Sequence, residues 1–146
     1  MDYERRNSVL RAYIAGRDWD TNAEFQLVRR LVAEGDVRLG SLTLLFDYEW
    51  EVSAGHSNHG CGDLVFTDGS GSFAVVEVKF IDDTRSGRTV RGKRRKSRKH
   101  VKKQALDYAA DLRQTLGADA QVVRAFIYTN QLGLVPADVP GDDEVV

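Results

Sequence analysis

Cysteine, proline and long apolar runs are all scarce in this sequence. It contains one cysteine, Cys61, and two prolines among its 146 residues. A lone cysteine excludes an intramolecular disulfide framework, so we expect a reducing, intracellular compartment. No apolar run approaches the roughly 20 residues that a membrane-spanning helix needs, so we expect no membrane partner. These absences leave a globular domain over residues 1–130 as the expected class, followed by a loose acidic tail over 131–146.

One long basic segment of the chain, residues 85–103, contains no acidic residue. The net charge of the chain is −1, yet eleven of its 21 lysines and arginines lie between Arg85 and Lys103, with no aspartate or glutamate among them. A basic block on an otherwise acidic domain is typical of a surface that binds polyanions. We expect these residues to contact nucleic acid: Arg91, Lys93, Arg94, Arg95, Lys96, Arg98, Lys99, Lys102 and Lys103. The run 93–96 also fits a nuclear localisation patch, and composition does not separate the two.

Two apolar runs of strand length predict a β-hairpin. Residues 62–66 and 73–80 are rich in Val and Phe, and the segment 67–72 between them carries the Asp-Gly and Gly-Ser signals of a tight connection. If the loop is centred on Ser70, opposed residues have numbers that sum to 140. Asp63 then faces Glu77.

Directly opposed carboxylates repel each other, because their Cβ atoms are roughly 5 Å apart. Lys79 falls on the same face as Glu77, since strand side chains alternate with period two. A divalent ion offsets more of the repulsion than one lysine does, and Mg²⁺ prefers carboxylate and phosphate oxygens. Such an ion lowers the pKa of a bound water, while a lysine stabilises charge that develops during phosphodiester hydrolysis. The residues predict a Mg²⁺ (or Mn²⁺) site; the alternative is a solvated sheet face with a Glu–Lys pair.

The pattern Gly62-Asp63, a fourteen-residue step and Glu77-Val78-Lys79 resembles the signature of the PD-(D/E)XK nuclease superfamily. The resemblance implies that Asp63 and Glu77 bind metal, that Val78 lends its backbone carbonyl, and that Lys79 serves the nucleophilic water. Gly62 stands where the name of the superfamily has proline. The resemblance further implies metal-dependent cleavage of DNA that leaves 5′-phosphate ends.

Glu24 has two interpretations. The sequence Thr21-Asn22-Ala23-Glu24 has the pattern of a capping box at the start of a helix over 22–34, in which Glu24 bonds back to Thr21. Glu24 also lies on the apolar stripe of that helix, three, four and seven residues before Leu27, Val28 and Leu31. Several branches of the superfamily have a first-helix glutamate that reaches the metal, so the resemblance makes Glu24 a candidate metal ligand. Both interpretations stay open.

A basic loop over 82–92 and a helix over 97–116 are expected after the hairpin. The loop contains two glycines among polar and cationic residues, and the helix has an apolar stripe that starts at Val101. Lys99, Lys102 and Lys103 then crowd the electropositive first turns, where they present charge to a phosphate.

Gln104 and Tyr108 lie four residues apart and so share a face of this helix. The pair looks like the Gln-hydrophobic-x-x-Tyr motif that follows Glu-x-Lys in the RecB-type branch of the superfamily. There the pair supports the active site and contacts the nucleic-acid backbone. The alternative for Tyr108 is a plain core residue.

Three other stretches complete the pattern. A helix is expected over 4–15 and a central strand over 121–129. A further strand is expected over 41–52; its alternation predicts burial on one face only, and Leu45 is the exception to that alternation. Trp50 fits a core position better than a base-stacking one.

His56 and His59 lie in the linker before Cys61, and they fit plain loop residues best. A zinc site built from the two histidines and Cys61 would need a fourth ligand. A role for either histidine near the scissile phosphate stays open.

The order of the elements predicts an α/β domain with a central mixed sheet and helices on both faces, and the resemblance implies a restriction-endonuclease-like core. The expected function is a metal-dependent, Mg²⁺-using deoxyribonuclease, structure-selective for branched DNA or ends. RNA is not excluded as substrate, and a homodimer is a further expectation. The protein would be nuclear in a eukaryote and cytoplasmic otherwise. The alternatives are a catalytically inactive nucleic-acid-binding domain of the same fold and a protein-interaction module. Endo- versus exonuclease action and the pathway stay open.

Overall fold

A five-stranded mixed sheet forms the centre of this computed structural model, which describes residues 2–51, 61–81 and 88–137, and only the backbone at 49–51, 61–63 and 88–98. The strands lie in the order β1 (Leu44–Glu51), β2 (Cys61–Thr67), β3 (Ser72–Lys79), β4 (Val122–Thr129) and β5 (Gly133–Pro136). The pair β3–β4 is parallel and the other three pairs are antiparallel.

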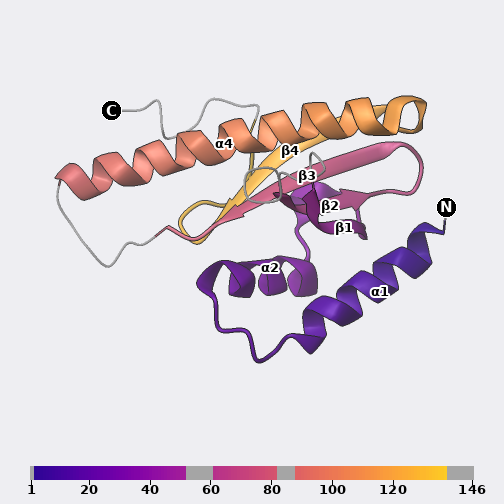
Figure 1. The fold of residues 1–146 in the computed structure, drawn as a ribbon, viewed down its shortest axis with the longest axis horizontal. Coiled ribbons are helices and arrows are strands. Elements are labelled where there is room, and N and C mark those ends of the chain that lie inside the picture. The colour runs from indigo at the N-terminus through magenta and orange to yellow at the C-terminus, as the bar shows by residue number, and fades with distance from the viewer. Residues whose placement is uncertain (1, 52–60, 82–87, 138–146) are drawn as a thin grey trace.

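Helices cover both faces of this sheet (Figure 1). Helices α1 (Tyr3–Gly16) and α2 (Ala23–Glu34) lie on one side, and α4 (Arg88–Leu116) lies on the other. Two short 3₁₀ turns, Val37–Leu39 and Gly117–Asp119, precede β1 and β4. The α/β class and the mixed sheet with helices on both faces are confirmed.

Each face of the sheet has its own apolar core, because alternate residues of the central strands point to opposite sides. Along β3, Ala74, Val76 and Val78 belong to the core under α1 and α2. Phe73 and Val75 belong to the core under α4. A strand with apolar residues at nearly every position is what a sheet buried on both faces requires.

Strand β1 departs from the predicted alternation. Its register against β2 shifts between Leu45 and Asp47, which marks an irregularity of the β-bulge kind. As a result Leu45 and Tyr48 pack toward the α1–α2 side, whereas Phe46 packs toward the α4 side. The prediction of a strand that is buried on one face only was therefore wrong, and Leu45, the noted exception to its alternation, was the residue that signalled the change.

Side chains of α1 bond to the outer edge of β1, a strand edge that would otherwise expose unpaired backbone groups. The amide of Leu45 donates to Oδ1 of Asn7 at 2.8 Å, and Nη2 of Arg11 donates to the carbonyl of Thr43 at 2.8 Å. Arg6 donates to the carbonyl of Phe46. Helix α1 thus protects the first half of this edge.

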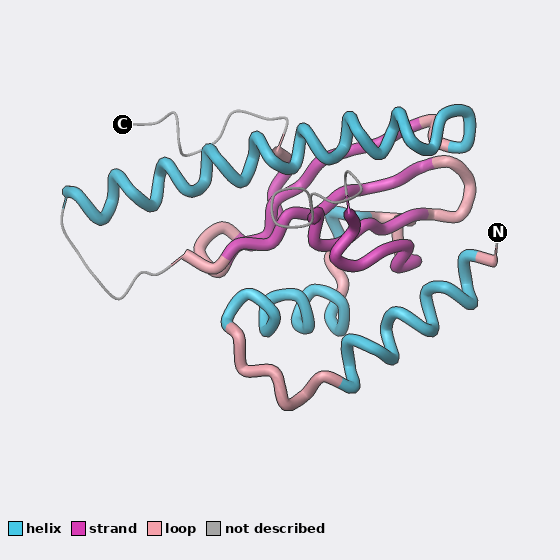
Figure 2. Tube along the Cα trace, viewed as in Figure 1, coloured by secondary structure: helices cyan, strands magenta, loops and turns pink. Residues whose placement is uncertain are grey.

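Helix α4 is the crossover between the parallel strands β3 and β4, as the tube trace makes clear (Figure 2). It begins at Arg88, nine residues before the predicted start at Ser97. The expectation of a loop reaching Gly92 was wrong: lysine and arginine are good helix formers, and one glycine costs only about 1 kcal/mol. Lys99, Lys102 and Lys103 therefore lie well inside the helix, and the argument that they occupy its electropositive first turns fails.

The end of the described chain is more ordered than the sequence suggested. The predicted tail was to start at residue 131, but Gly133–Pro136 forms β5 beside β4, and Leu134 is fully buried. The amide of Ala137 also donates to the carbonyl of Ala125 at 2.9 Å. Strand β4 is consequently an interior strand, as predicted. No helix in the described part of the chain has the length and apolar character to cross a membrane.

Candidate active site

The β2–β3 hairpin pairs in the predicted register. Four opposed pairs, from Thr67 with Phe73 to Leu64 with Val76, all have numbers that sum to 140. The recorded pairs end there, and extending the register by one residue would set Asp63 opposite Glu77. The side chain of Asp63 lies outside the described residues, so the distance between the two carboxylates stays a prediction.

The turn of this hairpin explains why the register is so well defined. Oδ1 of Asp68 accepts hydrogen bonds from the amides of Ser70, at 2.7 Å, and Ser72, at 3.1 Å. Gly69 and Gly71 have φ angles of 79° and 106°, a region that favours glycine. Because a slip of one residue would send every side chain to the wrong face, this turn also determines which face of the sheet Glu77 takes.

Glu77 is a buried acid near the end of β3. Its exposed fraction is 8%, and its Oε2 atom is shielded from solvent. It has the same strand parity as Phe73 and Val75, which pack under α4. Burying an ionised carboxylate is costly unless it is hydrogen-bonded, paired or bound to a metal, so Glu77 does not fit the alternative of a solvated sheet face.

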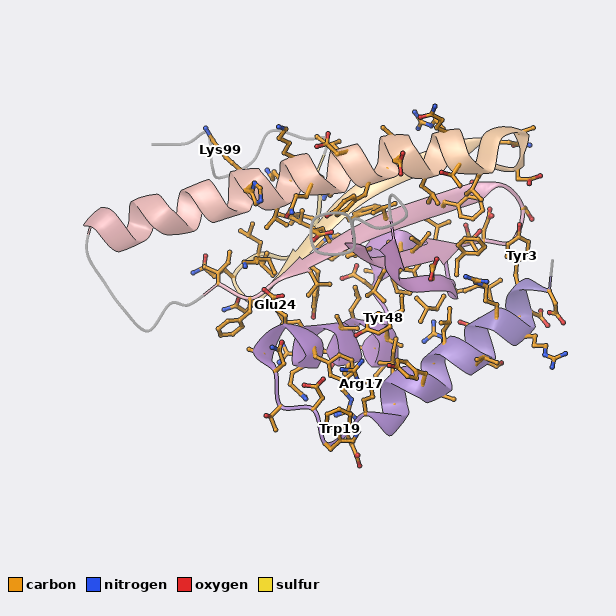
Figure 3. The ribbon with its side chains drawn as sticks, viewed as in Figure 1. Tyr3, Arg17, Trp19, Glu24, Tyr48 and Lys99 are labelled. Atoms are coloured by element: carbon orange, nitrogen blue, oxygen red, sulfur yellow. The ribbon has the colours of Figure 1, made fainter. Side chains whose placement is uncertain are left out.

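Glu24 and Lys79 meet across the gap between α2 and the end of β3. Oε1 of Glu24 lies 3.3 Å from Nζ of Lys79, and the two side chains are 45% and 44% exposed. Figure 3 shows Glu24 at the start of α2, beside the end of β3. An ion pair this exposed contributes at most about 1 kcal/mol to stability, so its interest lies in the position of the two groups.

The start of α2 differs from the predicted capping box. The helix begins at Ala23, and Oδ1 of its cap residue Asn22 accepts from the amides of Glu24, at 3.0 Å, and Phe25, at 3.2 Å. Thr21 is not the cap, because Asn22 satisfies these amides. The carboxylate of Glu24 instead points to Lys79.

A cation among aromatic rings anchors the loop that leads into α2. The guanidinium carbon of Arg17 lies 4.5 Å from the centroid of Phe25 and 5.5 Å from that of Trp19. Nη2 of Arg17 also lies 2.5 Å from a carboxylate oxygen of Asp20. Hydrogen bonds from the amide of Asn22 and, to a smaller extent, from the side chain of Arg17 hold the pKa of Asp20 below its ordinary value. The hydrogen bond to Asp20 in turn holds the pKa of Arg17 above the ordinary value for arginine. Sequence inspection missed this cluster, whose members carry no shared periodicity.

Asp47 is a second acid whose pKa is shifted, here upward, because burial penalises its charged form. The amide of Tyr48 donates to it, and Nη2 of Arg6 lies 3.6 Å away. Both partners oppose the shift without cancelling it. Asp47 therefore belongs to the contacts between α1 and β1, and it was not among the predicted site residues.

Gln104 and Tyr108 lie on α4 as predicted, one turn apart. Tyr108 is buried with Val75 and Ile127 in the core under α4, and Gln104 is half-buried. The core interpretation of Tyr108 is thus confirmed. Its role in bracing the catalytic groups stays a prediction.

The basic block divides by exposure. Lys99 and Lys103 are exposed, whereas Lys102 is only 9% exposed and faces the core side of α4. Lys102 is therefore not a solvent-facing cation, unlike the two exposed lysines of this block. The side chains of Arg91, Lys93, Arg94, Arg95, Lys96 and Arg98 lie outside the description, although their backbone is helical.

A hollow of about 490 Å³ lies elsewhere, between α1 and α2, and none of the predicted site residues lines it. Arg11 in its wall donates to Asn7, to the carbonyl of Val32 and to the carbonyl of Thr43. Burial lowers the pKa of Arg11. Because the guanidinium is engaged by these three acceptors, the hollow is a feature of the α1–α2–β1 junction and is not where the motif residues gather.

No set of three or more His, Cys, Asp or Glu side chains within the described residues is grouped as a metal site would be. That statement does not cover the Asp63 side chain, or His56 and His59, which lie outside those residues. Neither a family model, nor a curated protein, nor a solved structure matches this chain. The functional argument therefore depends on the residues and their geometry.

Proposed function

We propose that this chain is a metal-dependent nuclease of the PD-(D/E)XK superfamily, with a restriction-endonuclease-like core that hydrolyses DNA phosphodiester bonds. The observation that carries the proposal is the β2–β3 register, which is recorded as far as Leu64 and Val76 and which, extended by one residue, would set Asp63 opposite Glu77. Lys79 follows on the same strand, and Glu24 lies against it from α2. Glu77 lies two residues before Lys79 on β3, Glu24 meets Lys79 from α2, and Asp63 is expected opposite Glu77.

The donor chemistry of these residues fits a hard divalent cation. Glu77 is a buried carboxylate, and Glu24 holds an ammonium group 3.3 Å away, so the region stabilises positive charge. Asp63, Glu77 and the carbonyl of Val78 would hold Mg²⁺ or Mn²⁺, with Glu24 as a further oxygen donor. When bound, the ion would supply Lewis acidity and a water of lowered pKa.

Lys79 would act on the attacking water and on the phosphate. A protonated lysine has three donors and no acceptor, so it orients a water through the oxygen of that water. It also stabilises negative charge that builds up on the phosphate oxygens in the transition state. Glu24 positions the ammonium from the start of α2, and the exposure of Lys79 leaves it accessible to a substrate.

Replacing Lys79 by Ala tests the proposal. We expect cleavage of a panel of linear and branched DNAs in Mg²⁺ to fall at least about 100-fold, the scale of losing one donor that stabilises the transition state, while DNA binding is retained. Arg124→Gln on the neighbouring strand β4 is the matched control, since it removes an exposed cation from outside the site. DNA binding that is indifferent to Mg²⁺, with no cleavage by the unsubstituted protein, would instead assign the chain to the non-catalytic binding domains.

Replacing Glu24 by Gln tests the third acid. The side chain is half-exposed and caps nothing, so we expect the melting temperature to change little. We expect Mn²⁺ affinity, measured by calorimetry, to fall about tenfold, because a neutral amide oxygen is a weaker ligand than a carboxylate. Unchanged affinity would reduce Glu24 to a partner of Lys79.

A further inference from the structure

Helix α4 continues well beyond the sheet that it packs on. In Figure 1 its N-terminal turns extend past the ends of β3 and β4 along the long axis of the molecule. The first buried residue of α4 among those with described side chains is Val101, and Lys99 and His100 before it are exposed. Residues 88–100, which we call the arm, span about 20 Å at 1.5 Å per residue.

The arm has no apolar face. Eight of its thirteen residues are basic and none is acidic, namely Arg88, Arg91, Lys93, Arg94, Arg95, Lys96, Arg98 and Lys99. The four consecutive cations at positions 93–96 occupy every side of a helix with 3.6 residues per turn. A helix that is polar all round has no stripe with which to pack on its own protein.

A helix with basic positions on all sides can use all of its charges only where phosphates lie on both sides of it. The major groove of B-form DNA, about 12 Å wide and 8.5 Å deep, admits an α-helix between two phosphate backbones. A flat phosphate surface would contact one side of the arm. The major groove of double-stranded RNA is too deep and narrow for protein side chains to read.

The charges of the arm also couple its folding to binding. Arginine pairs four residues apart, such as Arg91 with Arg95 and Arg94 with Arg98, each cost about 0.2–0.5 kcal/mol of helix stability. Phosphates on either side would relieve this repulsion. The packed part of α4 supplies the helical turns from which the arm extends, so no new nucleus is needed.

We propose that the arm inserts into the major groove of duplex DNA and holds it against the Glu77–Lys79 end of the sheet. This inference rests on the proposed function for its choice of DNA, and it narrows the substrate to B-form duplex or to the duplex part of a branched molecule. Contacts to phosphates carry no sequence information, so the arm gives affinity with little sequence preference.

The test is a binding measurement on the full chain with EDTA, so that cleavage plays no part. We expect Arg94→Gln/Arg95→Gln to weaken binding of a 20-base-pair DNA duplex at least tenfold. The slope of log K against log salt should become shallower by about 2, or about 0.9 for each lost phosphate contact. The matched control is Arg5→Gln/Arg30→Gln, which removes the same charge from exposed positions on α1 and α2.

The groove is identified with modified duplexes. Bulky glucosyl groups on cytosine C5 fill the major groove, so they should abolish the difference between arm variant and control, whereas a minor-groove ligand should leave it intact. The proposal is overturned if an RNA duplex shows the same arm dependence, or if only the minor-groove ligand removes it. If DNA binding depends on the arm but the protein does not cleave DNA in Mg²⁺, the nuclease proposal is rejected and the proposed role of the arm is retained. If the protein cleaves DNA but binding does not depend on the arm, the role of the arm is rejected and the nuclease proposal is retained.

Discussion

The two halves of α4 form one continuous helix but differ in what stabilises them. Residues 101–116 bury Val101, Ala105, Tyr108 and Leu112 against the sheet. Residues 88–100 have only cations and small or polar residues around one valine, and they extend past the strands. Tertiary packing stabilises most helices in proteins, and the sequence offers an apolar stripe for it in one half alone. Because the arm has no such stripe, we expect its charge to be available to a partner.

The largest effect should come from removing an apolar side chain in the packed half. Leu112 is 1% exposed, so Leu112→Ala should lower the free energy of unfolding by about 2–5 kcal/mol through lost burial and a cavity. Leu106→Ala, on the same half but 41% exposed, should cost well under half of that. Urea denaturation measures both. Equal losses would contradict the assignment of one buried face to this half.

A smaller effect should distinguish the halves by the same substitution. Glycine in place of alanine costs about 1 kcal/mol in a helix interior. We expect Ala110→Gly, at an exposed position of the packed half, to show that cost in global unfolding. Lys99→Gly, measured against Lys99→Ala, should show little of it, because the arm can unfold without the core. A full 1 kcal/mol loss at Lys99 would mean that the arm folds as part of the core.

The smallest effect should be a response to salt that is confined to the arm. Raising the salt from 0.05 to 0.5 M shortens the screening length and weakens repulsion between like charges. Amide hydrogen exchange over 88–100 should slow a few-fold, since each relieved pair restores only about 0.2–0.5 kcal/mol. Exchange over 101–116 should hardly change, and it serves as the internal control. A DNA duplex should slow the arm further.

Local signals predicted some elements well and misjudged others. The hairpin was predictable because its turn residues and the two apolar runs that flank them are close along the chain, and together they favour one register. The start of α4 was not, because the glycines suggested a loop although the intervening lysines and arginines favour helix. Strand β5 was hidden because Gly133–Pro136 is short and includes a proline, which edge strands tolerate.

The candidate site was predictable in part for the same reason. Glu77 and Lys79 lie on one strand of the hairpin, and the position of Asp63 opposite Glu77 stays a prediction from its spacing along the chain. The partner of Glu24 was not predictable, because 55 positions separate it from Lys79 and no local pattern links a helix start to a strand end. The bulge in β1 was equally hidden, since only packing against two cores shows which face each residue takes.

The sequence by itself determined the strand pairing of the hairpin, the apolar stripe of α4 and the concentration of positive charge before it, because each follows from residues close along the chain. Only the tertiary structure decided that Glu24 reaches Lys79, that Lys102 is buried while Lys99 and Lys103 are exposed, and that the basic segment is a helical arm beyond the sheet. Those outcomes depend on which surfaces the sheet covers and where it ends, and that is settled by packing between segments far apart in sequence.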